Sequence, residues 1–146
     1  MKKIYIYYSL TGNGDIVGAK MNDLGYDVRK IHVKRELPKL FFFRMMVGGF
    51  KALIGYKDKI IDFDYDIDNY KEVVIGCPVW FDRLCSPVNT ILNNINLNNK
   101  KLSFILYSGS GECKRGVSFI KNKYRDSKIT ILKEPLKNLN ELDKIW

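Results

Sequence analysis

Short apolar runs alternate along the chain with segments that carry apolar residues at helical spacing. Most of the apolar runs lack polar alternation, which is typical of strands buried on both faces of a sheet. The segments between them repeat apolar residues every three or four positions, as helices packed on a sheet do. The expected strands are 3–8, 26–33, 72–76, 102–107 and 128–132, and the expected helices are 16–24, 86–95, 116–124 and 136–145.

Two segments fit this alternation less well. Segment 40–56 has near-helical apolar spacing, but Gly48-Gly49 predicts a kink or a helix end within it. Segment 62–68 alternates aspartates with apolar residues, which predicts an exposed strand edge or a loop. It lacks the glycine and the distant glutamate of a calcium loop, so we expect no metal site there.

The repeated order of strand and helix indicates an α/β protein with a parallel sheet covered on both faces. The 146 residues contain no internal repeat and no low-complexity linker, so we expect a single domain over 1–146. An apolar fraction of 46% with 28% charged residues excludes a disordered or fibrous chain.

Three loops that follow the first, third and fourth expected strands carry the candidate chemistry. In an open α/β sheet, ligands bind beyond the carboxyl ends of the strands, so these loops should be neighbours in space. The first loop offers the hydroxyls of Ser9 and Thr11 beside Gly12 and Gly14, which suits an anion held by hydroxyls and backbone amides at a helix start. It lacks both the lysine ending of a nucleotide P-loop and the three-glycine dinucleotide fingerprint.

The other two loops supply an aromatic wall and a flexible backbone edge. Trp80 and Phe81 follow Pro78, and flat rings of this kind suit stacking on a planar ligand. The loop Ser108-Gly109-Ser110-Gly111 lets the backbone approach a ligand closely. Each signal is weak alone, and an anion site, an aromatic wall and a glycine-rich edge at one place are much more specific together.

With these loops the sequence resembles the flavodoxin family. The family's phosphate loop, Ser/Thr-x-Thr-Gly-Asn-Thr, corresponds here to Ser9-Leu10-Thr11-Gly12-Asn13-Gly14, and its aromatic loop corresponds to the segment that ends Pro78-Val79-Trp80-Phe81. The resemblance covers nearly the whole chain in element order. It implies a flavodoxin-like three-layer α/β sandwich with a five-stranded parallel sheet in the order 2-1-3-4-5.

The resemblance also implies non-covalent binding of FMN, with the redox chemistry carried by the flavin and tuned by the protein. The phosphate loop would hold the FMN phosphate, the aromatic loop would flank the isoalloxazine ring, and the glycine-rich loop would line its polar edge. The candidate cofactor-binding residues are Ser9, Thr11, Gly12, Asn13, Gly14, Pro78, Val79, Trp80, Phe81, Ser108, Gly109 and Gly111.

The sequence departs from the family pattern in three ways. Gly14 replaces the last threonine of the phosphate motif, which removes a hydroxyl contact worth about 1 kcal/mol. The stretch Gly111-Glu112-Cys113-Lys114 offers no second stacking ring, so one flavin face would be open. The chain is basic, whereas the family is usually strongly acidic.

The net charge of +9 is concentrated between Arg29 and Lys59, where nine basic residues face only Glu36 and Asp58. Such a segment is either a solvated lysine-rich face or a surface for an anionic partner. For a flavin protein we expect a redox partner that is acidic at the contact. No aromatic-interleaved recognition motif supports binding to nucleic acid. Phe41, Phe42 and Phe43 follow one another directly, so we also expect some exposed apolar surface here.

The cysteines and the terminus predict a cytoplasmic protein. Cys77, Cys85 and Cys113 form no Cys-x-x-Cys pair and no even-numbered disulfide framework. The first residues are too short and too aromatic for a signal-peptide core, and no run is long and apolar enough to span a membrane. His32 is the only histidine, and we assign it no catalytic role.

The leading hypothesis is a flavodoxin-like protein that binds FMN and transfers electrons through it. One alternative is an FMN-dependent oxidoreductase that acts on a quinone or another small substrate. The other is a flavin-free module that binds a phosphate group or a partner through its basic face. The sequence alone does not decide between a carrier and an enzyme.

Overall fold

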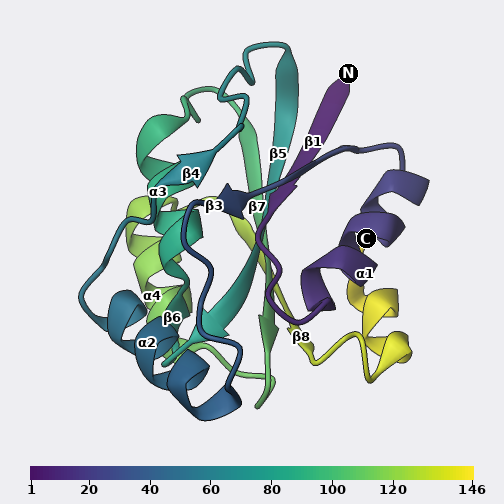
Figure 1. Cartoon of the computed structure of the whole chain (residues 1–146). Helices are drawn as coiled ribbons and strands as arrows, with labels where there is room; N and C mark the ends of the chain where they lie inside the picture. The colour runs from purple at the N-terminus through teal and green to yellow at the C-terminus, as the bar shows by residue number, and fades with distance from the viewer.

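The computed structural model describes residues 1–146, with every side chain except those of Phe41 and Phe42. Its main sheet has five parallel strands in the order β2-β1-β5-β7-β8 (Figure 1). In chain order this is 2-1-3-4-5, which confirms the predicted α/β fold. The strands are β1 (Lys2–Tyr7), β2 (Asp27–Lys30), β5 (Tyr70–Trp80), β7 (Lys101–Ser108) and β8 (Lys128–Lys133).

Helices cover both faces of the sheet and create two apolar cores (Figure 1). One face packs against α1 and against the C-terminal 3-10 helix, around Tyr5, Met21 and Ile105. The opposite face packs against the other helices, around Ile75, Ile91 and Phe104. The helices are α1 (Asn13–Asp23), α2 (Phe41–Leu53), α3 (Ser86–Asn94), α4 (Lys114–Lys123) and the 3-10 helix η1 (Leu139–Lys144).

The second expected strand, 26–33, is divided in two. β2 pairs with β1, and the backbone N–H of Ile31 still donates to the carbonyl of Tyr7 at 2.7 Å. The chain then leaves the sheet, and β3 (His32–Val33) pairs antiparallel with β4 (Ile60–Ile61). Ile31 and Val33 are both buried, so this departure carries apolar side chains into the core that faces α3.

Strand β5 is longer than predicted, because it continues through Pro78 to Trp80. It turns back at Phe81 and Asp82 and pairs antiparallel with β6 (Arg83–Leu84). Both turn residues have positive φ, 49° and 59°, which is the geometry of a tight two-residue hairpin. Of the four residues predicted to form an aromatic loop, Pro78, Val79 and Trp80 therefore belong to a strand, and Phe81 alone lies in the turn.

Helix α2 runs without interruption through Gly48-Gly49, so the predicted helix end at these glycines is wrong. A Cβ atom at Gly48 would lie 3.4 Å from the Trp80 ring, and one at Gly49 would lie 2.4 Å from the Phe81 ring. The helix therefore tolerates two glycines because they let it approach the hairpin closely. Phe43 is exposed, as expected for part of this aromatic run, whereas the side chains of Phe41 and Phe42 lie outside the described residues.

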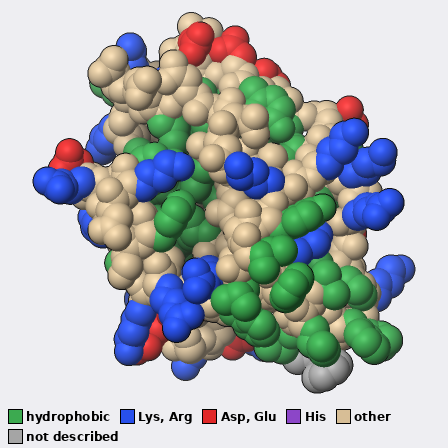
Figure 2. All heavy atoms as spheres, turned by 90° about the vertical axis from the view of Figure 1, so that its left-hand side faces the viewer, with side chains coloured by type: hydrophobic (Ala, Val, Ile, Leu, Met, Phe, Trp, Pro, Cys, Tyr) green, Lys and Arg blue, Asp and Glu red, His purple; other side chains and the backbone are tan. Residues whose placement is uncertain are grey.

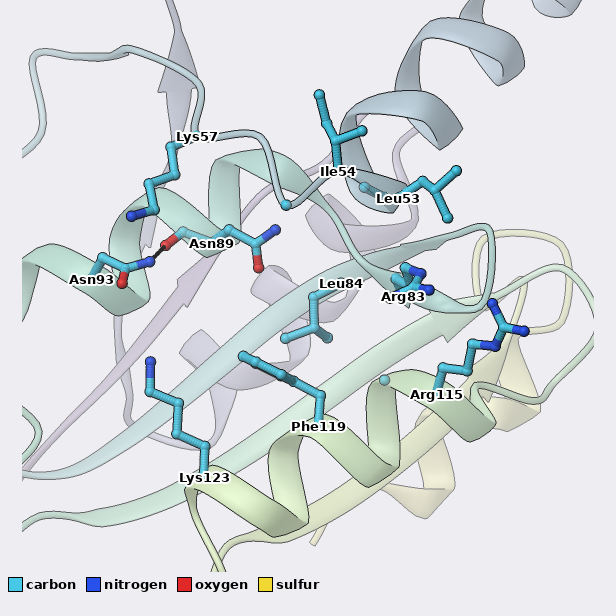
Figure 3. A pocket seen from close by; sticks show the side chains of 13 residues that line it. Leu53, Ile54, Lys57, Arg83, Leu84, Asn89, Asn93, Arg115, Phe119 and Lys123 are labelled. Carbon is cyan, nitrogen blue, oxygen red and sulfur yellow. Dashed lines mark hydrogen bonds between the residues drawn. The ribbon is translucent and has the colours of Figure 1, made fainter.

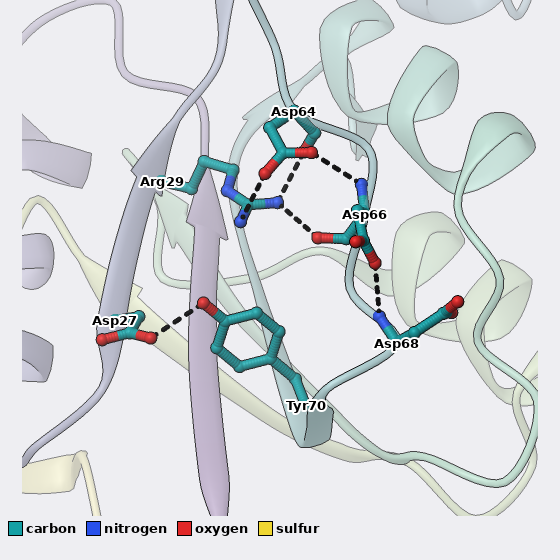
Figure 4. Close-up of polar contacts among 6 residues, drawn as sticks. All are labelled: Asp27, Arg29, Asp64, Asp66, Asp68 and Tyr70. Carbon is teal, nitrogen blue, oxygen red and sulfur yellow. Dashed lines mark hydrogen bonds and ion pairs between the residues drawn. The ribbon is translucent and has the colours of Figure 1, made fainter.

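The aspartate-rich segment 62–68 forms a loop (Figure 4). Asp64 Oδ1 accepts the backbone N–H of Asp66 at 2.9 Å, and Asp66 Oδ1 accepts that of Asp68 at 3.0 Å. Arg29 donates to the carbonyl oxygens of Asp64 and Asp66 and lies 3.2 Å from the Asp64 carboxylate. These carboxylates thus serve to fold the loop. Within the described side chains, no group of three or more His, Cys, Asp or Glu residues could hold a metal ion.

Candidate functional site

A cleft of about 300 Å³ opens at the carboxyl ends of β1, β5 and β7. It joins the loop after β1 to the β5–β6 hairpin and to the loop after β7, and α2 closes one side of it. Sequence reasoning predicted this meeting of three loops. Seven of the predicted residues line the cleft: Thr11, Asn13, Pro78, Val79, Trp80, Phe81 and Gly109.

Ser9 organises the loop between β1 and α1 from the inside. Its Oγ accepts the backbone N–H of Gly12 at 3.2 Å and that of Gly14 at 3.1 Å. Ser9, Gly12 and Gly14 therefore shape the loop and do not line the cleft. Gly12 has φ +93°, a left-handed conformation that favours glycine and lets the chain turn directly into α1.

The outer side of this loop offers groups that can bind an anion. No acceptor among the described residues takes the backbone N–H of Leu10 or Thr11. Asn13 Nδ2 donates to Thr11 Oγ1 at 3.3 Å, while Asn13 Oδ1 accepts the backbone N–H of Leu136 at 3.0 Å. Because α1 begins at Asn13, the positive end of its dipole also faces this region.

The structure explains why glycine replaces the last threonine of the phosphate motif. A Cβ atom at Gly14 would lie 2.6 Å from Tyr107 Oη and 2.8 Å from both Ser9 Cβ and Tyr7 Cδ2. The Tyr107 hydroxyl is fixed there because it donates to the carbonyl of Tyr8 at 2.5 Å. Position 14 therefore has no room for any side chain.

Asp15, in the first turn of α1, is held as a carboxylate by its neighbours. Lys30 Nζ lies 2.7 Å from Asp15 Oδ1, and the Tyr7 hydroxyl donates to the same oxygen at 2.8 Å. Partial burial alone would raise the pKa of Asp15, but these hydrogen bonds outweigh it and lower the pKa. Lys30 thereby offsets the negative charge that Asp15 would otherwise present to an anion in the loop.

The aromatic wall of the cleft comes from the β5–β6 hairpin. The Trp80 ring meets the Tyr8 ring edge-on, with ring centroids 5.9 Å apart. Tyr8 is fixed in turn, since its hydroxyl donates to Glu36 at 2.9 Å. Phe81 stands at the turn with 52% of its surface exposed, and its ring lies against Gly49 of α2. The Trp80 ring is therefore fixed as one wall of the cleft, and the Phe81 ring lies exposed at the edge of that wall.

A second hollow of about 350 Å³ adjoins the cleft, with Val79 and Gly109 shared between them. Ser108, predicted from sequence, lines this second hollow, and its Oγ donates to the carbonyl of Glu112 at 2.8 Å. Gly111 lines neither space, but its φ of +82° shapes the loop. The loop supplies no aromatic ring to either space.

Sequence reasoning missed the contribution of α2. Arg44 is the one cation among the described residues that line the cleft, and its Nε donates to the carbonyl of Pro38 at 3.2 Å. The weak signal for this helix was its aromatic and basic composition, whereas its position depends on contacts distant in sequence. The residues not predicted are Leu10, Arg44, Met45, Gly48, Gly49, Tyr107 and Glu134.

The cysteines near the cleft are buried thiols. Cys77 Sγ lies 3.4 Å from Cys85 Sγ and 3.2 Å from the carbonyl oxygen of Pro78. Burial and the neighbouring Cys85 raise the pKa of the Cys77 thiol well above its usual value. Burial likewise raises the pKa of Cys113 to about 12. Both thiols are therefore protonated near neutral pH.

The sequence matches no family model and no curated protein. Solved structures do resemble the chain. A candidate flavoprotein from Bacteroides eggerthii is 21% identical, with a TM-score of 0.69 over 99% of this chain and 97% of that one. A flavoprotein from Lactobacillus acidophilus, solved in complex with FMN, is 17% identical, with a TM-score of 0.69 over 95% and 97%.

A flavodoxin from the domain Archaea is 15% identical, with a TM-score of 0.55 over 99% of this chain and 93% of that one. No described helix of the present chain has the length and apolar character needed to cross a bilayer. At identities this low a likeness establishes the fold alone. Together with the strand order, it shows that the chain has a flavodoxin-like fold.

Proposed function

We propose that the chain binds FMN non-covalently in the cleft between the three loops and transfers electrons through it. The observation that carries this proposal is that one cleft joins an amide-rich and hydroxyl-rich loop, an aromatic wall and a glycine-rich edge. The likeness to a flavoprotein solved with FMN supports the same cofactor.

The chemistry of the cleft fits the parts of FMN. The backbone N–H groups of Leu10 and Thr11, together with the start of α1, suit a phosphate dianion. Trp80 and Phe81 offer flat rings for an aromatic cofactor, and Gly109 leaves backbone groups accessible at its edge. The cleft is at the small end of ligand sites, so a ring bound there would keep one edge in solvent.

When bound, FMN supplies the redox chemistry, and the side chains around it only position and tune it. Thr11 and Asn13 would orient the phosphate, since their side chains already hold each other at 3.3 Å. Arg44, the cation of the cleft, would favour negative charge in the neighbouring ring. Trp80 would exclude water from one side, because the edge-on Tyr8 ring holds its ring in place.

The test is a titration of the purified protein with FMN, followed by visible absorbance and flavin fluorescence. Trp80→Ala removes the aromatic wall, and we expect it to weaken binding about tenfold or more, as stacking contacts of this size do. Trp146→Ala is the matched control, because Trp146 packs beside Ile145, in the core on the other face of the sheet. If the wild-type chain fails to bind FMN at high micromolar concentration, the proposal is wrong.

An oxidoreductase is the second candidate, and one observation favours it. The second hollow adjoins the cleft and carries no ring, so a small substrate such as a quinone could approach the flavin there. Oxidation of a reduced nicotinamide by the FMN-loaded protein, with a quinone as acceptor, distinguishes an enzyme from a carrier. Steady turnover supports the enzyme. Slow electron exchange without turnover supports the carrier.

We propose that a carrier of this kind meets an acidic redox partner. The basic segment 29–59 lies beside the cleft, because Arg44, Met45 and Gly48 belong to both. Opposite charges speed the encounter of such partners, and salt slows it. Electron transfer to an acidic acceptor should therefore slow as ionic strength rises.

A further inference from the structure

Helix α2 places its small residues inward and its large apolar residues outward. Gly48, Gly49 and Ala52 are the buried residues among the described side chains of the helix, and the two glycines lie against the rings of the hairpin. The opposite stripe follows the spacing i, i+1, i+4, i+7 and i+8 along the helix surface. We call it the outer stripe; it consists of the exposed residues Met46, Val47, Phe50, Leu53 and Ile54.

The outer stripe is unusual for a surface helix, which normally turns its large apolar side chains toward the core. Phe50 is 59% exposed and Ile54 is 55% exposed. Figure 2 shows green apolar side chains gathered at the lower right, where α2 lies, with no red among them. Contiguous apolar surface of this kind marks a place of contact with another apolar phase.

Basic residues surround the outer stripe. Between Lys34 and Lys59 the sequence has seven lysines and arginines against two acids. With both acids counted, this segment keeps a net charge of 7 − 2 = +5. Glu36 accepts the hydroxyl of Tyr8 at 2.9 Å, and Asp58 lies 2.5 Å from Lys51 and also accepts the hydroxyl of Ser86. The face around α2 therefore presents positive charge to its surroundings.

The C-terminal end of the outer stripe opens into a groove of about 400 Å³ (Figure 3). Leu53 and Ile54 form its rim, and Phe119 of α4 lies across from them. No acidic residue lines it, and the buried Nε of Arg83 has no hydrogen-bond partner among the described residues. The basic residues that line the groove are Lys57, Arg83, Arg115 and Lys123.

We propose that this face docks on a bilayer that contains anionic phospholipid. Helix α2 would lie in the plane of the membrane surface, with the outer stripe in the boundary between head groups and acyl chains. The four cations of the groove would face the lipid phosphates. An apolar ridge with a basic surround is the pattern of helices that lie on membranes, and each cation near an anionic surface adds attraction. At 13 residues, α2 is too short to span.

The charges favour a lipid surface over a second copy of the chain. Two copies meeting through α2 would bring two positive faces together, which like charges disfavour. The ridge also projects outward, whereas a protein partner would need a matching apolar groove. A fluid bilayer accepts projecting methionine and phenylalanine side chains without such a fit.

The experiment is flotation of the full chain with vesicles of phosphatidylcholine alone and of phosphatidylcholine mixed with phosphatidylglycerol. We expect binding to the anionic vesicles only, and weaker binding as salt increases. The double variant Phe50→Ser with Leu53→Ser should bind at least about tenfold more weakly, because it removes two large apolar side chains. Neither residue lines the FMN cleft, so FMN affinity should stay unchanged and report an intact fold.

Matched control variants distinguish binding through the α2 face from effects of any loss of apolar surface or positive charge. Leu139→Ser removes an exposed leucine on the other face of the sheet, and it should bind vesicles like the wild type. Lys123→Glu should weaken binding, whereas Lys20→Glu on α1 makes the same charge change elsewhere and should weaken it far less.

Three results would overturn the proposal. The first is the absence of binding to anionic vesicles at low salt. The second is full binding by the Phe50 and Leu53 double variant. The third is a dimer that light scattering detects without lipid and that the double variant abolishes, while the wild-type chain does not bind vesicles. In that case a second copy of the chain would cover the outer stripe.

Discussion

The packing of side chains behind the cleft requires glycine at position 14. A Cβ atom there would lie within 2.8 Å of three side-chain atoms, from Tyr107, Ser9 and Tyr7. We expect Gly14→Ala to lower the free energy of unfolding by about 1–3 kcal/mol, because overpacking forces its neighbours to shift. Gly109→Ala is the control, since nothing lies within 4 Å of a Cβ at that position. Urea unfolding measures both, and equal midpoints would contradict the packing argument.

The contact between α2 and the hairpin allows a test at the level of the element. Alanine in place of glycine normally stabilises a helix interior by about 1 kcal/mol. At Gly49, however, the new Cβ would lie 2.4 Å from the Phe81 ring. We therefore expect Gly49→Ala to be destabilising in the wild-type chain.

The same substitution should be stabilising in a Phe81→Gly background, which removes the ring and also relieves the positive φ at the turn. The difference between the two backgrounds should be about 2 kcal/mol, as for residues in direct contact. Thermal unfolding of the four proteins measures this coupling. If Gly49→Ala has the same effect in both backgrounds, the glycines do not serve the close approach to the hairpin.

These elements also show which parts of the fold can be predicted from sequence. β1 and β7 were predicted because strands buried on both faces appear as continuous apolar runs. The extension of β5 was missed, since Pro78 looks like the end of a strand and the turn at Phe81 and Asp82 has no glycine or asparagine to signal a hairpin.

The same limit applies to the site. The three loops could be placed together, because the carboxyl ends of parallel strands share one edge of the sheet. The role of α2 could not, because its closeness to Trp80 and Phe81 depends on two glycines that look like helix breakers in sequence. Local signals therefore predict the strands and loops, and tertiary packing decides the helix that covers them.

Both apolar cores of the molecule contain buried tyrosines, whose hydroxyl groups can ionise. Five tyrosines are buried in its cores: Tyr5, Tyr7, Tyr8, Tyr26 and Tyr107. Burial raises the pKa of each of them, and that of Tyr26 reaches about 12. A raised folded-state pKa means that the unfolded chain loses these protons first, near pH 10. The stability they support is therefore complete below about pH 10 and is lost as the pH rises through the folded-state values.

We expect the chain to unfold cooperatively in alkaline solution. The fully buried Tyr5 and Tyr107 alone should remove up to about 1.4 kcal/mol each per pH unit above pH 10. Tyrosinate absorbance from the core should rise together with the loss of near-ultraviolet circular dichroism. If it rises while the circular dichroism is unchanged, the rings are accessible in the folded chain and this account of the cores is wrong.

Substitution of Tyr5 is the most informative test of alkaline unfolding. Its hydroxyl is buried without a hydrogen-bond partner among the described residues, whereas the Tyr107 hydroxyl donates to the carbonyl of Tyr8. Tyr5→Phe should therefore leave stability at pH 7 equal or higher and shift alkaline unfolding to higher pH, because it removes an unpaired buried group and a titrating proton together. Tyr107→Phe should shift the transition in the same direction but cost about 1 kcal/mol at pH 7, since it orphans a buried carbonyl. An unchanged alkaline midpoint in both variants would mean that the core phenols do not limit the stability of the folded chain.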